Sequence, residues 1–116
     1  MPGQFRWSVD RVAKAVEPVV RQGVGAVLLF GQTDQPKDND GSAAWDDNAP
    51  VQQAVRVLKS AFPELTVITD VCLCAYTHHG HCAPLHSDGS LDNDAGCTCL
   101  AKVALSHVAA GADVVA

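Results

Sequence analysis

Residues 51–71 read VQQAVRVLKSAFPELTVITDV, and this stretch carries the clearest pattern of a helix followed by a strand. Its first half predicts an amphipathic helix over 51–61, because apolar residues recur at i, i+3, i+4 and i+7. These residues are Val51, Ala54, Val55 and Leu58. Residues 62–64 end the helix, and the β-branched run at 65–71 predicts a strand. A helix followed closely by a strand is the repeating unit of α/β folds.

The residues before this stretch predict another helix and another strand. Valine and alanine recur near helical spacing in residues 8–22, so we expect a helix that Gly23 ends. Pro18 lacks a backbone donor, and we expect a kink or a late break of the helix there. The apolar run at 26–30, bounded by glycines, predicts a strand buried on both faces.

Two polar segments separate the remaining elements. Residues 31–50 are dominated by Asp, Asn, Gly, Ser and Pro and predict a long surface loop. Residues 72–90, rich in Cys, His and Gly, predict a second loop. Either Asp92 or Asn93 is suited to cap a helix over 94–110, after which a third strand begins.

The predicted elements alternate between helices and strands, and the last strand lies at 112–115. This alternation is typical of a parallel sheet in an α/β fold, either a (β/α)8 barrel or an open doubly wound sheet. A complete barrel needs roughly 250 residues, whereas this chain has 116. The sequence has no internal repeat and no linker, so we expect one domain.

Composition excludes several classes of protein. Hydrophobic residues make up 47% and charged residues 18% of the sequence, which is typical of globular proteins rather than disordered ones. The net charge is -5 and the basic residues are scattered, so nucleic acid is not an expected partner. The apolar runs are too short to span a bilayer, and the start does not resemble a signal peptide. We therefore expect no membrane association and a cytoplasmic location.

Three cysteines follow the predicted strand at 65–71 as Cys72, Cys74 and Cys82. In a parallel α/β sheet, the loop that leaves the carboxyl end of a strand carries the chemistry. Cysteines two apart on an extended backbone can face one ion, and Gly80 allows the loop to return Cys82 to the same point. Three thiolates leave a fourth coordination position for water or substrate, as in catalytic zinc sites.

Other interpretations of this segment stay open. The cysteines would be small buried hydrophobes if they held no metal, and the histidines would be ordinary loop residues. His79 or His81 would also suit the same ions as ligands. A redox pair is disfavoured, because the spacing is C-x-C rather than C-x-x-C.

The residue type alone allows two roles for each of three further residues. Cys97 and Cys99 form a second C-x-C, but they fall within the predicted third helix and point in different directions, so we expect core or surface thiols rather than ligands. Asp70 closes the strand before the cysteines. Its carboxylate would either contact a substrate amine and assist proton transfer or simply stabilise a turn.

In successive segments that occur in the family's order along essentially the whole chain, the sequence resembles the porphobilinogen synthase (5-aminolevulinate dehydratase) family of the zinc-dependent type. The cysteine segment is the most specific of these. The matching stretches are Met1-Pro2-Gly3 with Arg6, residues 31–45 containing Asp40-Gly41-Ser42-Ala43, residues 61–65, Asp70-Val71-Cys72-Leu73-Cys74, Tyr76-Thr77, His79-Gly80-His81-Cys82, Asp88-Gly89, residues 92–95 and residues 109–113.

The resemblance implies a fold and an activity. It implies that residues 1–116 are part of an aldolase-type (β/α)8 TIM barrel, about three βα units of it. It implies a lyase of tetrapyrrole (haem) biosynthesis that condenses two molecules of 5-aminolevulinate to porphobilinogen and assembles as a homo-octamer. Cys72, Cys74 and Cys82 would hold the catalytic Zn²⁺, and Asp70 would be catalytic. Any additional Mg²⁺ would bind outside these residues.

The resemblance also implies that parts of the active site lie elsewhere. The family's two Schiff-base lysines match none of Lys14, Lys37, Lys59 and Lys102. We therefore expect the chain to be an internal fragment that binds metal but is inactive alone. The alternative is a non-catalytic zinc-binding or oligomerisation module from a truncated copy. A reading frame that continues into two further strands, each ending in lysine, would favour the enzyme.

Overall fold

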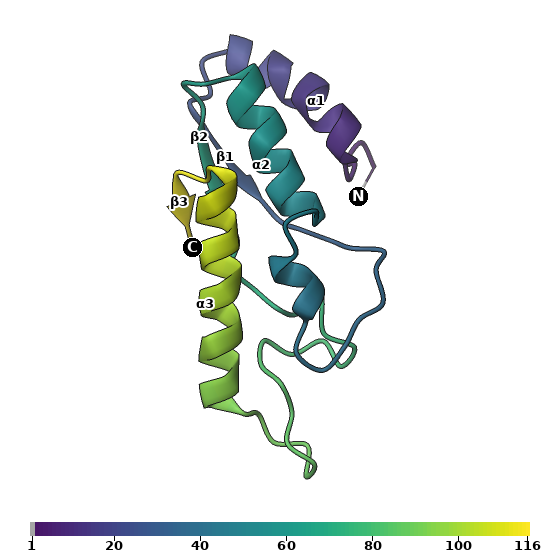
Figure 1. The fold of residues 1–116 in the computed structure, drawn as a ribbon. Helices are drawn as coiled ribbons and strands as arrows, with labels where there is room; N and C mark the ends of the chain where they lie inside the picture. Colours follow the sequence, from purple (N-terminus) through teal and green to yellow (C-terminus); the bar gives the residue numbers. More distant parts are fainter. Residues whose placement is uncertain (1) are drawn as a thin grey trace.

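The computed structural model describes residues 2–116, which alternate between helices and parallel strands (Figure 1). The elements in chain order are α1 (Val9–Arg21), β1 (Ala26–Leu29), the 3-10 helix η1 (Ser42–Trp45), α2 (Pro50–Ala61), β2 (Thr66–Thr69), α3 (Asn93–Ala110) and β3 (Val114–Val115). The order and type of the helices and strands expected from the sequence are confirmed. No helix in residues 2–116 is both long and apolar enough to cross a membrane.

The three strands form one parallel sheet in the order β1-β2-β3. Ala26 pairs with Thr66 at the start of β1 and β2, and Ile68 pairs with Val114 where β3 begins. Parallel neighbours require a crossover connection, which α2 and α3 provide. All three helices lie over one face of the sheet (Figure 1). The carboxyl ends of the strands therefore meet at one edge, together with the loops that follow them.

The main core lies between the helices and the sheet. Val55 and Leu58 of α2 are fully buried there against Val67 of β2, because the apolar face of α2 points toward the sheet. At the amino ends of the strands, Lys59 donates hydrogen bonds to the Leu65 carbonyl and to the Asp113 carboxylate. Lys59 thus ties α2 to the starts of β2 and β3.

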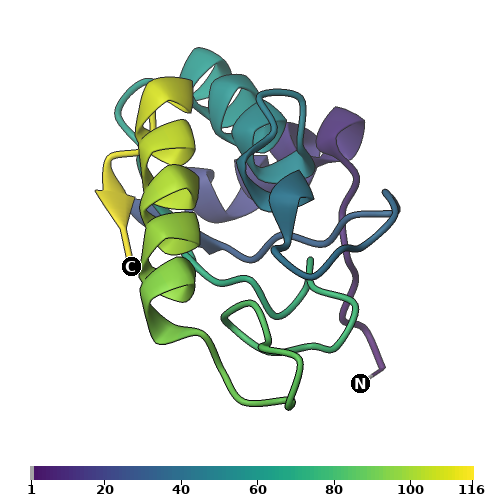
Figure 2. The same cartoon turned by 60° about the horizontal axis from the view of Figure 1, so that its bottom comes forward.

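A second apolar cluster lies beneath the loops at the carboxyl end of the sheet. It joins Ala44 of η1, Leu73 and Tyr76 of the cysteine loop, and Cys99 and Val103 of α3. Figure 2 shows these loops gathered beside η1 and the amino-terminal half of α3. The expected surface loop at 31–50 is therefore only partly a surface feature, since η1 packs into this cluster.

Two sequence-based expectations need correction. β1 is not buried on both faces: the side chain of Leu28 is 47% exposed and that of the following Phe30 is 72% exposed. The helices cover one face of the sheet only, and an apolar run does not reveal how many faces are covered. In α1, Pro18 does not break the helix, which continues to Arg21. The proline is exposed there, and the helix ends three residues later at Arg21, with Gln22 as its C-cap.

Candidate metal centre

The cysteine loop begins at the carboxyl end of β2. The Asp70 amide donates to the Leu29 carbonyl of β1, and the Val71 amide donates to the Ala116 carbonyl beyond β3. The backbone is therefore held by both neighbouring strands up to Val71. Cys72 is the first residue beyond this support, so it leaves the sheet at a fixed position.

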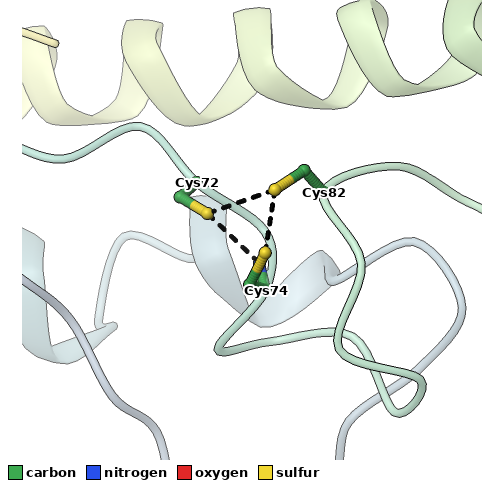
Figure 3. A group of neighbouring side chains, drawn as sticks. All are labelled: Cys72, Cys74 and Cys82. Carbon is green, nitrogen blue, oxygen red and sulfur yellow. Dashed lines mark hydrogen bonds between the residues drawn. The ribbon is translucent and has the colours of Figure 1, made fainter.

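The three sulfurs of Cys72, Cys74 and Cys82 converge (Figure 3). All three Sγ atoms lie within 4.8 Å of one another. The Cys72 and Cys82 sulfurs are 3.5 Å apart, and those of Cys74 and Cys82 are 2.8 Å apart. The Cys74 amide also donates to the Cys72 sulfur at 3.5 Å. The three residues singled out by the sequence form the one group with this metal-ligand geometry in residues 2–116.

This donor set fits a thiophilic divalent ion such as zinc. Zinc–sulfur bonds of about 2.3 Å place tetrahedral thiolates roughly 3.8 Å apart. The separation between Cys72 and Cys82 is close to that value, whereas Cys74 and Cys82 must separate by about 1 Å to admit an ion. Cys82 is exposed, and Cys72 and Cys74 are half-buried. A fourth ligand would therefore approach from solvent.

The proximity of the sulfurs also changes their acidity. A hydrogen bond with Cys82, burial and the neighbouring Cys72 raise the pKa of Cys74 to about 12. The thiol of Cys74 thus holds its proton at neutral pH when the cluster contains no cation. A divalent ion must displace thiol protons to bind, so binding releases protons and strengthens as the pH rises.

Local packing explains why the loop adopts this shape. The Leu73 side chain, between the first two cysteines, is 0% exposed in the second apolar cluster, which turns its neighbours outward. Gly80 adopts a φ of 78°, a conformation that glycine alone readily allows, and reverses the loop toward Cys82 as expected. The Thr77 hydroxyl donates to the His81 carbonyl at 2.8 Å and closes this reversal.

Asn39 supports the cysteine loop, although it was not among the residues expected at the site. Its side-chain oxygen accepts a hydrogen bond from the Leu85 amide, and its carbonyl oxygen accepts one from His79 Nε2. The neighbouring Asp38 carbonyl accepts from the His78 amide. The loop after β1 therefore holds the loop that carries the cysteines. The turn-forming composition around Asn39 indicated a loop, but no local signal indicated its partner.

Two histidines of the cysteine loop make contacts that do not involve the three sulfurs. Both ring nitrogens of His79 are engaged, Nε2 with the Asn39 carbonyl and Nδ1 with the His81 amide. The rings of His79 and His81 are stacked, with their centroids 5.5 Å apart. Neither histidine belongs to the converging group of sulfurs. The open alternative of histidine ligation gains no support from this arrangement.

Asp70 lies at the edge of the centre, near two buried side chains. Burial raises the pKa of the Tyr76 hydroxyl, and the charges of Asp70 and Cys72 add to this rise. Burial lowers the pKa of His107, whereas the Asp70 carboxylate opposes that shift. A carboxylate at the start of the cysteine loop, close enough to influence both groups, is suited to contact a cationic amine of a substrate.

The second C-x-C pair does not join the centre. Cys97 is exposed on α3 and Cys99 is buried in the second apolar cluster, so the two side chains point in different directions as expected. Cys99 shares this cluster with Leu73 and Tyr76 of the cysteine loop, and burial raises its pKa. Both residues act as structural or surface thiols in this arrangement.

Comparison with known proteins identifies close relatives. A family model described as delta-aminolevulinic acid dehydratase matches residues 1–116. The chain is 47% identical over 116 residues to the delta-aminolevulinic acid dehydratase of Ruminiclostridium josui, covering 100% of this chain and 56% of that protein. It is 44% identical over 117 residues to that of Bos taurus, covering 100% of this chain and 36% of the relative.

A solved structure has the same fold. It is the delta-aminolevulinic acid dehydratase (porphobilinogen synthase) of Toxoplasma gondii ME49, in complex with the reaction product porphobilinogen. The TM-score is 0.93 with 32% sequence identity, over 99% of this chain and 33% of that one. The three parallel strands and their helices are thus part of a (β/α)8 barrel. The chain spans between about a third and just over half of the length of these relatives.

Proposed function

The chain belongs to the delta-aminolevulinic acid dehydratase family, and we propose that it forms the metal-binding part of a lyase of tetrapyrrole biosynthesis. The reaction would be the condensation of two 5-aminolevulinate molecules to porphobilinogen. The solved relative that contains porphobilinogen as its reaction product supports this assignment. The observation that carries it is the convergence of three sulfurs at the carboxyl end of β2, where barrel enzymes place their active sites.

In this proposal, Cys72, Cys74 and Cys82 hold a catalytic zinc ion. A bound zinc would act as a Lewis acid toward a substrate carbonyl or amine. The three thiolates would fix the ion beside β2, and the exposure of Cys82 leaves its outer side accessible. Asp70 would hold the amino group of a substrate and accept a proton from it, because Asp70 lies at the carboxyl end of β2, two residues before Cys72.

The remaining parts of the proposal concern the whole protein. Residues 1–116 would form part of one aldolase-type barrel domain in a cytoplasmic homo-octamer. Any magnesium ion would bind outside these residues. The family relationship supports these assignments, since the match runs along the whole chain.

The chain alone would bind metal without turning substrate over. Amine catalysis requires a desolvated lysine beside the substrate carbonyl. Lys59 is engaged at the opposite end of the sheet by Asp113, and the Lys102 ammonium lies 5.0 Å from the ring centroid of Trp45. Lys14 and Lys37 are both exposed, so neither amine is desolvated. None of these four lysines therefore offers a desolvated amine beside Asp70.

Metal analysis of matched cysteine variants tests the centre. We expect about one zinc per chain in the unchanged protein, a large loss of zinc in Cys74→Ser, and no loss in Cys97→Ser, whose thiol lies outside the cluster. Zinc content that is unchanged in Cys74→Ser, or lost equally in Cys97→Ser, would contradict the assignment.

An activity assay tests the catalytic part. Incubation of the zinc-loaded chain with 5-aminolevulinate should yield no porphobilinogen, because the chain contributes no Schiff-base lysine. The substrate should nevertheless change the absorption of a cobalt-substituted centre, and Asp70→Asn should weaken that response while metal content stays the same. Product formation by the chain alone, or an equal response in Asp70→Asn, would contradict this proposal.

A further inference from the structure

Helix α3 packs against the loop that carries the cysteines at Gly96. Gly96 is buried in the first turns of the helix, directly against Ala83. A Cβ atom added at Gly96 would lie 2.6 Å from the Ala83 Cβ, 3.3 Å from the Ala83 Cα and 3.8 Å from the Cys82 carbonyl oxygen. Real Cβ atoms do not approach other atoms to 2.6 Å, so a side chain at residue 96 must displace Ala83 or the helix.

A hydrogen bond also joins the first turn of α3 to residues 83–84, and we call this contact region the junction. The Asp92 amide donates to the Pro84 carbonyl at 2.9 Å, and the Asp92 carboxylate accepts from the Ala95 amide at 2.9 Å. Ala83 and Pro84 are both buried. The first turn of α3 and residues 83–84 are therefore joined by a hydrogen bond as well as by packing.

The third thiol depends on this junction more than the other two do. Cys72 and Cys74 flank the fully buried Leu73 at the end of β2. Cys82 is exposed, so packing of its own side chain does not fix it. The position of its sulfur follows from the backbone on both sides: the hydrogen bond from Thr77 to the His81 carbonyl holds the residues before Cys82, and Ala83 and Pro84 after it rest on α3.

We propose that Gly96 is a positioning residue for the metal centre: it lets α3 approach Ala83 closely enough to place the Cys82 sulfur beside those of Cys72 and Cys74. This inference rests on the proposed metal site. Glycine is a poor helix former, and Gly96 lies in the interior of α3. The close contact with Ala83 supplies the physical reason for its presence there.

The test uses a pair of complementary substitutions. Gly96→Ala adds the methyl group that collides with Ala83, and Ala83→Gly removes the methyl group that it meets. The double variant therefore restores the space while keeping the change in the helix. Gly25→Ala is the matched control, since nothing lies within 4 Å of a Cβ at that position and its backbone is not left-handed.

Two measurements are made on each variant of the full chain. Competition with a chromogenic chelator gives the zinc affinity, and the sulfur-to-cobalt charge-transfer absorption of the Co²⁺ form reports how many thiolates bind. We expect Gly96→Ala to weaken zinc binding by about 10- to 100-fold, as for other groups that support metal ligands. Its charge-transfer absorption should fall toward that of Cys82→Ser.

The double variant should recover both signals to near the unchanged chain, and Gly25→Ala should alter neither. A general loss of helix stability would not be rescued in this way, because Ala83→Gly does not strengthen the helix. Unchanged zinc affinity in Gly96→Ala, or no recovery in the double variant, would overturn the inference alone. Absence of metal binding by the unchanged chain would overturn the proposed centre, and this inference with it.

Discussion

His107 links α3 to the end of β2 through a buried hydrogen bond. Its Nδ1 lies 3.0 Å from the Thr69 hydroxyl oxygen, and both side chains are almost completely buried. Thr69 immediately precedes Asp70, so this bond supports the backbone from which the cysteine loop starts. Burial lowers the pKa of His107 below its ordinary value of 6.5, although the Asp70 carboxylate opposes the shift.

This shift predicts an acid-sensitive fold. The unfolded chain binds a proton at residue 107 more readily than the folded chain does, so the stabilisation is present above about pH 6.5 and is lost as the pH falls toward the lowered pKa. Urea unfolding should show a smaller loss of stability between neutral and mildly acidic pH in His107→Phe than in the unchanged chain.

The same variant tests the hydrogen bond. His107→Phe leaves the Thr69 hydroxyl unpaired and should cost about 1–3 kcal/mol at neutral pH, whereas Thr69→Val combined with His107→Phe should recover part of that cost. Equal pH dependence in the variant and the unchanged chain would show that His107 is not the group responsible.

The residue scale also shows what sequence could predict. Cys72, Cys74 and Cys82 were identifiable because their types and spacing suit one ion. Asn39 and Gly96 were not, because their importance depends on contacts with residues far from them or on a neighbouring helix. A polar loop residue and a helical glycine can each have many roles, and the tertiary contacts of the residue are needed to identify its role.

At the scale of elements, α3 shows how local signals and tertiary packing combine. Its start was predictable, since Asp92 accepts a hydrogen bond from the Ala95 amide and the helix begins at Asn93. Its end at Gly111, with a φ of 105°, follows the usual glycine termination. The strands were predicted longer than they are, because β-branched composition extends beyond the residues that find a pairing partner.

Loss of the cap of α3 should be measurable. Asp92→Ala should lower the free energy of unfolding by about 1 kcal/mol, whereas Asp92→Ser should retain most of it because a hydroxyl also accepts the Ala95 hydrogen bond. Thermal unfolding followed by circular dichroism gives both values. Equal stability of the alanine and serine variants would mean that the cap does not stabilise the helix.

At the scale of the whole molecule, the two apolar clusters stabilise different regions. The main core joins the helices to the strands, and the second cluster supports the loops that carry the candidate centre. The alternation of helices and strands was sufficient to predict a parallel α/β sheet. It did not distinguish a barrel from an open sheet, since both use the same βα units and differ in closure.

Metal binding should therefore stabilise the loop end of the molecule. A ligand at 100 times its dissociation constant adds about 2.7 kcal/mol of stability. Addition of a strong chelator should lower the melting temperature, and the effect should be larger at alkaline pH, because the raised pKa of Cys74 opposes zinc binding by the protonated cluster. Cys74→Ser should melt at the same temperature with and without the chelator.

We propose that three sulfurs of one loop bind a single zinc ion and leave one coordination position open. X-ray absorption at the zinc edge of the zinc-loaded chain measures this coordination directly. The account predicts three sulfur ligands at about 2.3 Å and a lighter atom in the remaining position. A spectrum with four sulfurs would instead bring Cys97 or Cys99 into the site, and one with nitrogen and oxygen ligands alone would remove the cysteines from it; either result would contradict the account.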